Sequence, residues 1–180
     1  MIPKLFSVLA ICFWLTKVYG AEEKKDPFES ESKNPLAHGF GDDIAWVPWD
    51  DAIDLAQQEK KPIFLLIHKT WCHACQTLKK RFQQQSAFKQ LLEISKHFIM
   101  VNTEDDEEPW EEKYQPDGKY IPRLLFLDQE GDVLDFKNPK AEYENYKHYY
   151  ASPAQVFHGM RAVLKQHYKI HIPDPEKKQK

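Results

Sequence analysis

The chain has 180 residues, a formal net charge of −3 at pH 7 and 42% hydrophobic residues. Its basic residues are scattered along the sequence, which argues against a nucleic-acid-binding protein. Once the N-terminal segment is set aside, the length suits one domain with a single core. No later segment is apolar over the roughly 20 residues that a membrane-spanning helix needs, so we expect no membrane span in the mature chain.

The first residues have the pattern of a secretory signal peptide. A short basic start precedes an apolar stretch from Leu5 to Leu15, and the small residue Gly20 ends the segment. A membrane anchor is the alternative, but the apolar stretch is shorter than a spanning helix requires. The expected organisation is a signal peptide at 1–20, a flexible lead-in at 21–38, a folded domain at 39–170 and a charged tail at 171–180.

Hydrophobic patterning predicts an α/β fold in which a central mixed sheet is flanked by helices. In the first half of the domain we expect a helix from Asp50 or Asp51 to about Lys60, a strand at 63–67 and a helix from Cys72 to about Gln85. A helix capped by Ser86 and a strand at 98–101 follow. The second half should hold antiparallel hairpin strands at 123–128 and 133–136 and a helix that starts at Ser152-Pro153. The acidic segment 104–112 is expected to be a solvated loop, with calcium binding as the alternative.

The motif Trp71-Cys72-His73-Ala74-Cys75 lies where the first predicted strand ends and the next helix begins. The free N–H groups and the dipole of a helix N-terminus favour an anion. A thiolate is such an anion, and it is the form of cysteine that attacks disulfides. The position of the motif therefore predicts a redox-active dithiol.

Cysteine counting supports this interpretation. Of the three cysteines, Cys12 lies in the predicted signal peptide, so the mature chain keeps one pair, Cys72 and Cys75. A structural disulfide between them is one alternative. With only two residues between the cysteines, however, such a bond would constrain little of the unfolded chain. A zinc half-site with His68 or His73 is another, although a closed zinc site needs four ligands. We expect no metal.

Further motifs carry a resemblance to a known family. The strand–CxxC–helix unit, followed by Ile121-Pro122 before a strand and hairpin, resembles the thioredoxin fold. Five segments narrow the resemblance to the small endoplasmic-reticulum branch that holds thioredoxin domain-containing protein 12 and the anterior gradient proteins. These segments are Gly39–Asp42, Ile67–Cys72, Met100–Asn102, Glu107–Pro109 and Pro116–Arg123, and the resemblance covers about residues 39–168.

The resemblance implies a lumenal thiol–disulfide oxidoreductase that acts on protein or glutathione disulfides. Cys72 would attack the client and Cys75 would resolve the mixed disulfide. His73, when protonated, would tune Cys72 toward the thiolate. Trp71 would shield one side of the site, while Ile121 and a cis Pro122 would shape a groove for an extended client strand. No cofactor is implied beyond glutathione or another thiol as redox partner.

Two departures from the family pattern matter. Thioredoxins carry a buried acid six residues before the first cysteine, where this chain has Leu66. The printed sequence ends Glu176-Lys177-Lys178-Gln179-Lys180 without a Lys-Asp-Glu-Leu type of signal. From the resemblance we expect residence in the endoplasmic-reticulum lumen. Secretion is the alternative, because this signal is missing. A client-binding or chaperone module with incidental redox activity, and a structural domain with an inert bridge, are the alternative functions.

Overall fold

The structure of the protein is a computed structural model, which describes residues 34–141 and 144–174. The expected signal peptide and residues 21–33 of the expected lead-in lie outside the described residues. The elements are η1 (Pro35–Ala37), β1 (Trp46–Val47), α1 (Trp49–Glu59), β2 (Ile63–His68), α2 (His73–Phe82), α3 (Gln85–Ser95), β3 (Ile99–Glu104), η2 (Asp105–Glu107), η3 (Glu112–Tyr114), β4 (Arg123–Leu127) and α4 (Pro153–His167), where η denotes a 3₁₀ turn.

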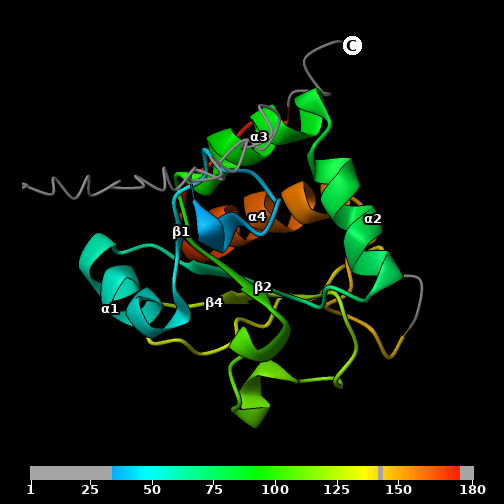
Figure 1. Cartoon of the computed structure of the whole chain (residues 1–180). Helices are drawn as coiled ribbons and strands as arrows, with labels where there is room; N and C mark the ends of the chain where they lie inside the picture. The colour runs from blue at the N-terminus through cyan, green and yellow to red at the C-terminus, as the bar shows by residue number, and fades with distance from the viewer. Residues whose placement is uncertain (1–33, 142–143, 175–180) are drawn as a thin grey trace, which may run out of the picture. The chain divides into compact units, whose positions relative to one another are not determined.

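The four strands form one mixed sheet in the order β1-β3-β2-β4. β1 and β2 run parallel to β3, whereas β4 runs antiparallel to β2. All six residues of β2 are buried, because this strand is central and covered on both faces. The mixed sheet flanked by helices confirms the expected fold class (Figure 1).

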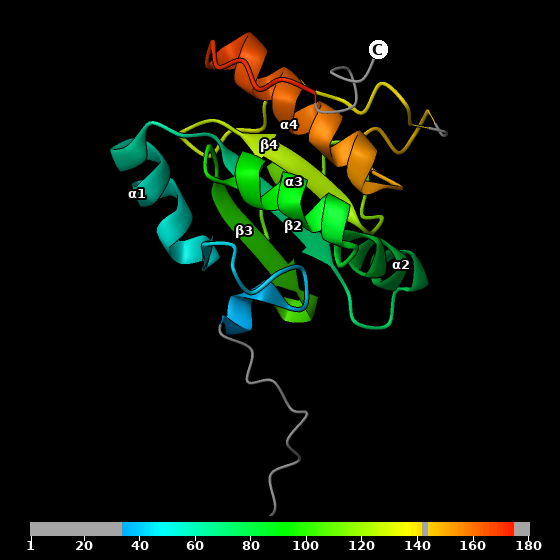
Figure 2. The ribbon, with the colours of Figure 1, turned by 90° about the horizontal axis from the view of Figure 1, so that it is seen from above.

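Alternation along β2 divides the interior into two cores. Phe64 and Leu66 point to the face that carries α2, α3 and α4, whereas Ile63, Leu65 and Ile67 point to the face that carries α1. The two views of the ribbon show α1 on one side of the sheet and the other helices on the opposite side (Figures 1 and 2). This arrangement fixes the end of β2, and with it the start of α2, in a rigid frame.

The predicted strand at 133–136 is wrong. Beyond β4 only an isolated bridge joins Leu127 to Val133, in antiparallel sense. Leu134 still donates a hydrogen bond from its amide to the carbonyl of Phe126 at 2.8 Å. The amide of Phe136 then bonds the carbonyl of Leu134 at 2.7 Å, which turns the chain and brings the Phe136 ring to 5.7 Å from that of Phe126. Core packing thus replaces the continued ladder, and β4 remains an edge strand.

Several element boundaries also differ from the prediction. The short strand β1 was not predicted, and α3 begins at Gln85 after the N-cap Gln84, so Ser86 is not its cap. α4 starts at Pro153 as predicted, but Ser152 makes no side-chain capping bond. The side chain of Gln155 instead accepts from the amide of Ala151 at 2.8 Å.

The ordered part of the domain starts earlier than residue 39. Ala37 in η1 is fully buried, and its carbonyl accepts a hydrogen bond from the side chain of Asn102 at 2.7 Å. Residues 34–38 therefore pack against the end of β3, within the segment expected to be a flexible lead-in. No helix within 34–141 and 144–174 is long and apolar enough to cross a membrane.

Candidate redox site

Cys72 is the N-cap residue of α2, directly after the turn that follows β2. The amide of Cys72 bonds the carbonyl of Lys69 at 3.2 Å and closes this turn. Its Sγ accepts a hydrogen bond from the amide of Cys75 at 3.2 Å. A sulfur atom here occupies the place of the side-chain oxygen that usually caps a helix. The N-terminus of α2 thus presents backbone donors to Cys72, as the sequence predicted.

The two cysteines differ in burial and in setting. Cys75 lies inside the first turn of α2, only 1% exposed, on the face that also buries Leu78 and Phe82. Burial, followed by the hydrogen bond with Cys72, raises the pKa of Cys75 to about 12. Cys72 is 7% exposed. Both are free thiols, so the site is described in its reduced form.

Ile121-Pro122 lies beside the dithiol, although 49 residues separate Ile121 from Cys72. The peptide bond between Ile121 and Pro122 is cis, which confirms the expectation from sequence. The Sγ of Cys72 lies 3.9 Å from the carbonyl oxygen of Ile121, within reach of a weak S–H···O bond. The backbone before β4 is therefore part of the surroundings of the dithiol.

Arg123 anchors the segment that carries Ile121. Its side chain is fully buried at the start of β4. The guanidinium donates from Nε to the carbonyl of Tyr114 at 2.8 Å and from Nη1 to that of Tyr120 at 2.9 Å, and it forms an ion pair with Glu108. Arg123 therefore holds the loop in place through buried hydrogen bonds that only the fold reveals.

The acidic segment is not simply a solvated loop, because two of its residues hold the turn before Cys72. The carboxylate of Asp105 accepts from both the amide and the hydroxyl of Thr70 at 2.9 Å. These bonds keep the pKa of Asp105 below its ordinary value. Lys69 pairs with Glu108 at 3.1 Å and also donates to the carbonyl of Asp105. One carboxylate, that of Glu108, thereby joins the turn before the dithiol to Arg123.

The remaining predicted site residues lie at the surface. Trp71 is 75% exposed and His73 is also exposed, and the described contacts include no hydrogen bond between His73 and either thiol. A second exposed tryptophan, Trp110 at 87%, follows Glu108 and Pro109, and sequence reasoning did not single it out. The sequence has no local signal that distinguishes Trp110 from an ordinary loop residue, because single exposed apolar side chains are common on protein surfaces.

Two buried residues near the dithiol need separate mention. Leu66, at the position of the acid in thioredoxins, is buried in the core and provides no proton acceptor. His68 at the end of β2 is 1% exposed, and burial, followed by the charges of Lys79 and His38, lowers its pKa to about 4. His68 is therefore neutral at physiological pH. No group of three potential metal-ligating side chains converges in the part of the chain that the structure describes.

Comparison with known proteins gives the family of this chain. The thioredoxin-like family matches residues 45–129. Anterior gradient protein 3 of Mus musculus is 32% identical over 125 residues, which cover 69% of this chain and 73% of that protein. The Homo sapiens protein of the same name is 33% identical over the same shares. A solved structure of a disulphide isomerase from Xylella fastidiosa Temecula1 has a TM-score of 0.44 and 21% identity, covering 63% of this chain and 86% of that one.

The sheet order, the strand–CxxC–helix unit and the matched residues define a thioredoxin-like domain. Within that class, the identity to relatives over most of their length assigns the family. The chain belongs to the anterior gradient protein family.

Proposed function

We propose that this protein is a thiol–disulfide oxidoreductase that reduces, forms or exchanges disulfides through Cys72 and Cys75. The observation that carries the proposal is the setting of Cys72. Its sulfur caps α2 by accepting a hydrogen bond from the amide of Cys75. The same sulfur lies 3.9 Å from the carbonyl oxygen of Ile121. A cysteine at a helix N-terminus with a second thiol one turn on is suited to disulfide exchange.

Reduction of a client proceeds in two exchanges. The thiolate of Cys72 attacks one sulfur of the client disulfide, the client S–S bond breaks, and one client thiol leaves with a proton from solvent. Cys75 then loses its proton and attacks the Sγ of Cys72, which releases the second client thiol. The client gains two electrons and the Cys72–Cys75 pair becomes a disulfide, which glutathione or another thiol reduces. The same steps in reverse oxidise a client.

The difference in burial supports different roles for the two thiols, with Cys72 as the attacking thiol and Cys75 as the resolving thiol. Cys75, with a pKa of about 12, stays protonated until the mixed disulfide forms. Leu66 has no carboxylate to take this proton, so water or another base accepts it. His73, at the first position of α2, would favour the Cys72 thiolate when protonated.

The client would bind as an extended strand beside Ile121 and Pro122. The half-buried Ile121 presents its backbone next to Cys72, and an extended segment can bond to such a backbone by β-augmentation. Trp71, largely exposed, would cover one side of this groove. Disulfide-containing proteins are the expected partners, and glutathione is a further one.

We place the protein in the endoplasmic-reticulum lumen, with secretion as the alternative. The hydrophobic pattern of residues 1–20 and the family of the chain support the secretory pathway. Expression in cells, with fractionation of lumen and medium, tests this assignment. Recovery of the unprocessed chain from the cytosol alone would overturn it.

The exposed tryptophans favour a second candidate, a client-binding module in which redox turnover is incidental. Trp71 and Trp110 are 75% and 87% exposed, and an exposed aromatic side chain is a common anchor for a partner. The loop that carries Trp110 is joined to the dithiol turn through the Glu108–Lys69 ion pair.

Reduction of insulin by dithiothreitol separates the two functions. An oxidoreductase accelerates the reduction, and Cys72→Ser abolishes the acceleration. A binding module leaves the rate unchanged but delays aggregation of the insulin chains, and Cys72→Ser retains that delay. No acceleration by the wild type would refute the oxidoreductase proposal.

A further inference from the structure

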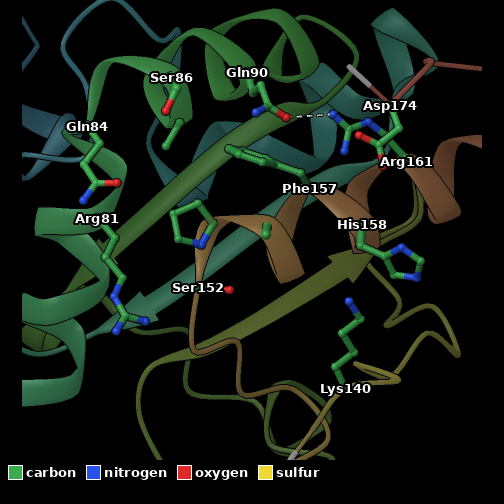
Figure 3. Close-up of a pocket in the computed structure, with 13 residues that line it drawn as sticks. Arg81, Gln84, Ser86, Gln90, Lys140, Ser152, Phe157, His158, Arg161 and Asp174 are labelled. Carbon is green, nitrogen blue, oxygen red and sulfur yellow. Dashed lines mark hydrogen bonds between the residues drawn. The ribbon is translucent and has the colours of Figure 1, made fainter. Parts of the chain in front are cut away.

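A cavity of about 440 Å³ lies between the N-terminal turns of α3 and α4. Its lining comes from the end of α2, the starts of α3 and α4, the loop at Lys140 and the C-terminal segment at Asp174 (Figure 3). Among the described residues that line it, none belongs to the segments 71–75 or 120–123. The cavity is therefore separate from the proposed redox site.

Basic side chains from three parts of the chain surround this cavity. They are Arg81 on α2, Lys140 in the loop before α4, and His158 and Arg161 on α4. Figure 3 shows these side chains around the first turns of α4. Asp174 is the one acidic side chain among the described lining residues. The chain as a whole carries a net charge of −3, so this concentration of basic groups runs against its average.

The two arginines each donate one side-chain hydrogen bond to the described residues. Arg81 uses Nη1 to bond the carbonyl of Ala151 at 2.6 Å, and Arg161 uses Nη2 to bond the side chain of Gln90 at 3.0 Å. A guanidinium carries five N–H donors. Arg81 is exposed, so its remaining N–H donors can reach an anion in the cavity.

The backbone adds to the positive character of the cavity. α3 and α4 both begin at it, and neither helix has a side-chain cap. The hydroxyl groups of Ser86 and Ser152 are available at these two helix starts, and both residues line the cavity. Helix N-termini attract anions through free amides and the helix dipole. Side-chain and backbone groups therefore favour the same kind of ligand.

We infer that this cavity binds a tetrahedral oxyanion, a phosphate or sulfate group carried on a larger molecule. Guanidinium and ammonium groups are the donors that such oxyanions prefer, and arginine can form bidentate bonds with them. The cavity has more volume than the oxyanion needs. A neighbouring cavity of about 680 Å³ shares His158, Arg161 and Asp174 with it and offers a path for the rest of the molecule.

A substitution at Asp174 tests whether charge governs binding in this cavity. Its carboxylate lies close to Arg161 in Figure 3 and would repel an incoming oxyanion. Asp174→Asn should therefore tighten binding, whereas loss of a cationic group should weaken it. A cavity that binds through shape or apolar contact alone would respond to neither change.

The test is calorimetric titration of the full mature chain with inorganic phosphate and with inorganic sulfate, at ionic strength held constant with sodium chloride. We expect saturable binding to the wild type and a loss of about tenfold or more in affinity for Arg81→Gln combined with Lys140→Gln. Lys80→Gln is the matched control, because it removes one charge from an exposed neighbour on the same helix. It should bind as the wild type does.

Comparison of the two anions identifies the source. Equal affinity would assign a tetrahedral oxyanion of either kind, and tighter binding of one of the two anions would assign the group of that kind. Absence of saturable binding, or equal weakening by Lys80→Gln and by the double variant, would overturn the inference. Insulin reduction should be unchanged in the double variant, so this result is independent of the proposed redox function.

Discussion

The amide of Cys75 donates a hydrogen bond to the Sγ of Cys72 across 3.2 Å, so the backbone of one cysteine caps the side chain of the other. Cys72 receives a backbone donor that stabilises negative charge on its sulfur. Cys75 lies inside the helix, and burial raises its pKa to about 12. The same hydrogen-bonded turn thus places the two sulfurs in different settings, and the proposed mechanism rests on this difference.

Alkylation should follow this difference. With reduced protein and a limiting amount of iodoacetamide at neutral pH, Cys72 should be modified first and Cys75 only slowly, because thiolate is the reactive form. Peptide mapping by mass spectrometry measures the order. Modification of Cys75 ahead of Cys72 in the folded protein would contradict the assigned roles.

Removal of the resolving thiol should trap clients. In Cys75→Ser the mixed disulfide on Cys72 cannot collapse, so adducts should accumulate on non-reducing gels and disappear with dithiothreitol. Cys72→Ala is the matched control and should give neither adducts nor turnover. Full turnover by the Cys75→Ser variant would remove Cys75 from the mechanism.

His73→Leu should slow disulfide reduction at neutral pH, because it removes the imidazole proposed to favour the Cys72 thiolate. His167→Leu, which changes another exposed histidine at the end of α4, is the control and should have no effect. The rate of iodoacetamide reaction at Cys72 as a function of pH measures the effect directly. Identical profiles for wild type and His73→Leu would reduce His73 to a surface residue.

Arg123→Met should destabilise the domain by about 3 kcal/mol, because it removes a buried charge from its partners. The carbonyls of Tyr114 and Tyr120 lose their donor, and the carboxylate of Glu108 keeps only its ion pair with Lys69. Urea denaturation followed by fluorescence measures the loss. Lys113→Met is the control, since its ion pair with Asp132 is exposed, and it should cost well under 1 kcal/mol. Comparable losses in both variants would show that Arg123 does not anchor the loop.

The buried His68 should make stability depend on pH between about 6.5 and 4. In this window the unfolded chain takes up a proton on this histidine while the folded chain, with a pKa of about 4, does not, so stability falls as pH falls. The loss due to His68 approaches roughly 3 kcal/mol at the acid end.

The test is urea denaturation at a series of pH values. His68→Phe, which keeps a ring against Phe40, should flatten this part of the profile, and the exposed His167→Gln should not. An unchanged slope in His68→Phe would assign the acid sensitivity to other groups.

Much of the site could be predicted from local sequence. The run at 63–67 is too apolar to be anything but a central strand, and the cysteines follow at the spacing of a helix start, so Cys72 and Cys75 were placed correctly. Ile121-Pro122 was expected next to the dithiol from a resemblance, and the structure agrees. The strand at 133–136 was not formed: after the bridge at Val133 the chain turns, and Phe136 packs on Phe126 in the core.

The sequence by itself determined most of the helices and strands, the division into an apolar core and a polar surface, and the position of the dithiol at a strand–helix junction. These depend on the period of hydrophobic residues and on neighbours along the chain. Tertiary structure alone decided that Arg123 meets Glu108 and that Arg81 and Arg161 line one cavity. Such contacts join residues with no local relation, since sheet register and helix packing set them, and no spacing in the sequence encodes them.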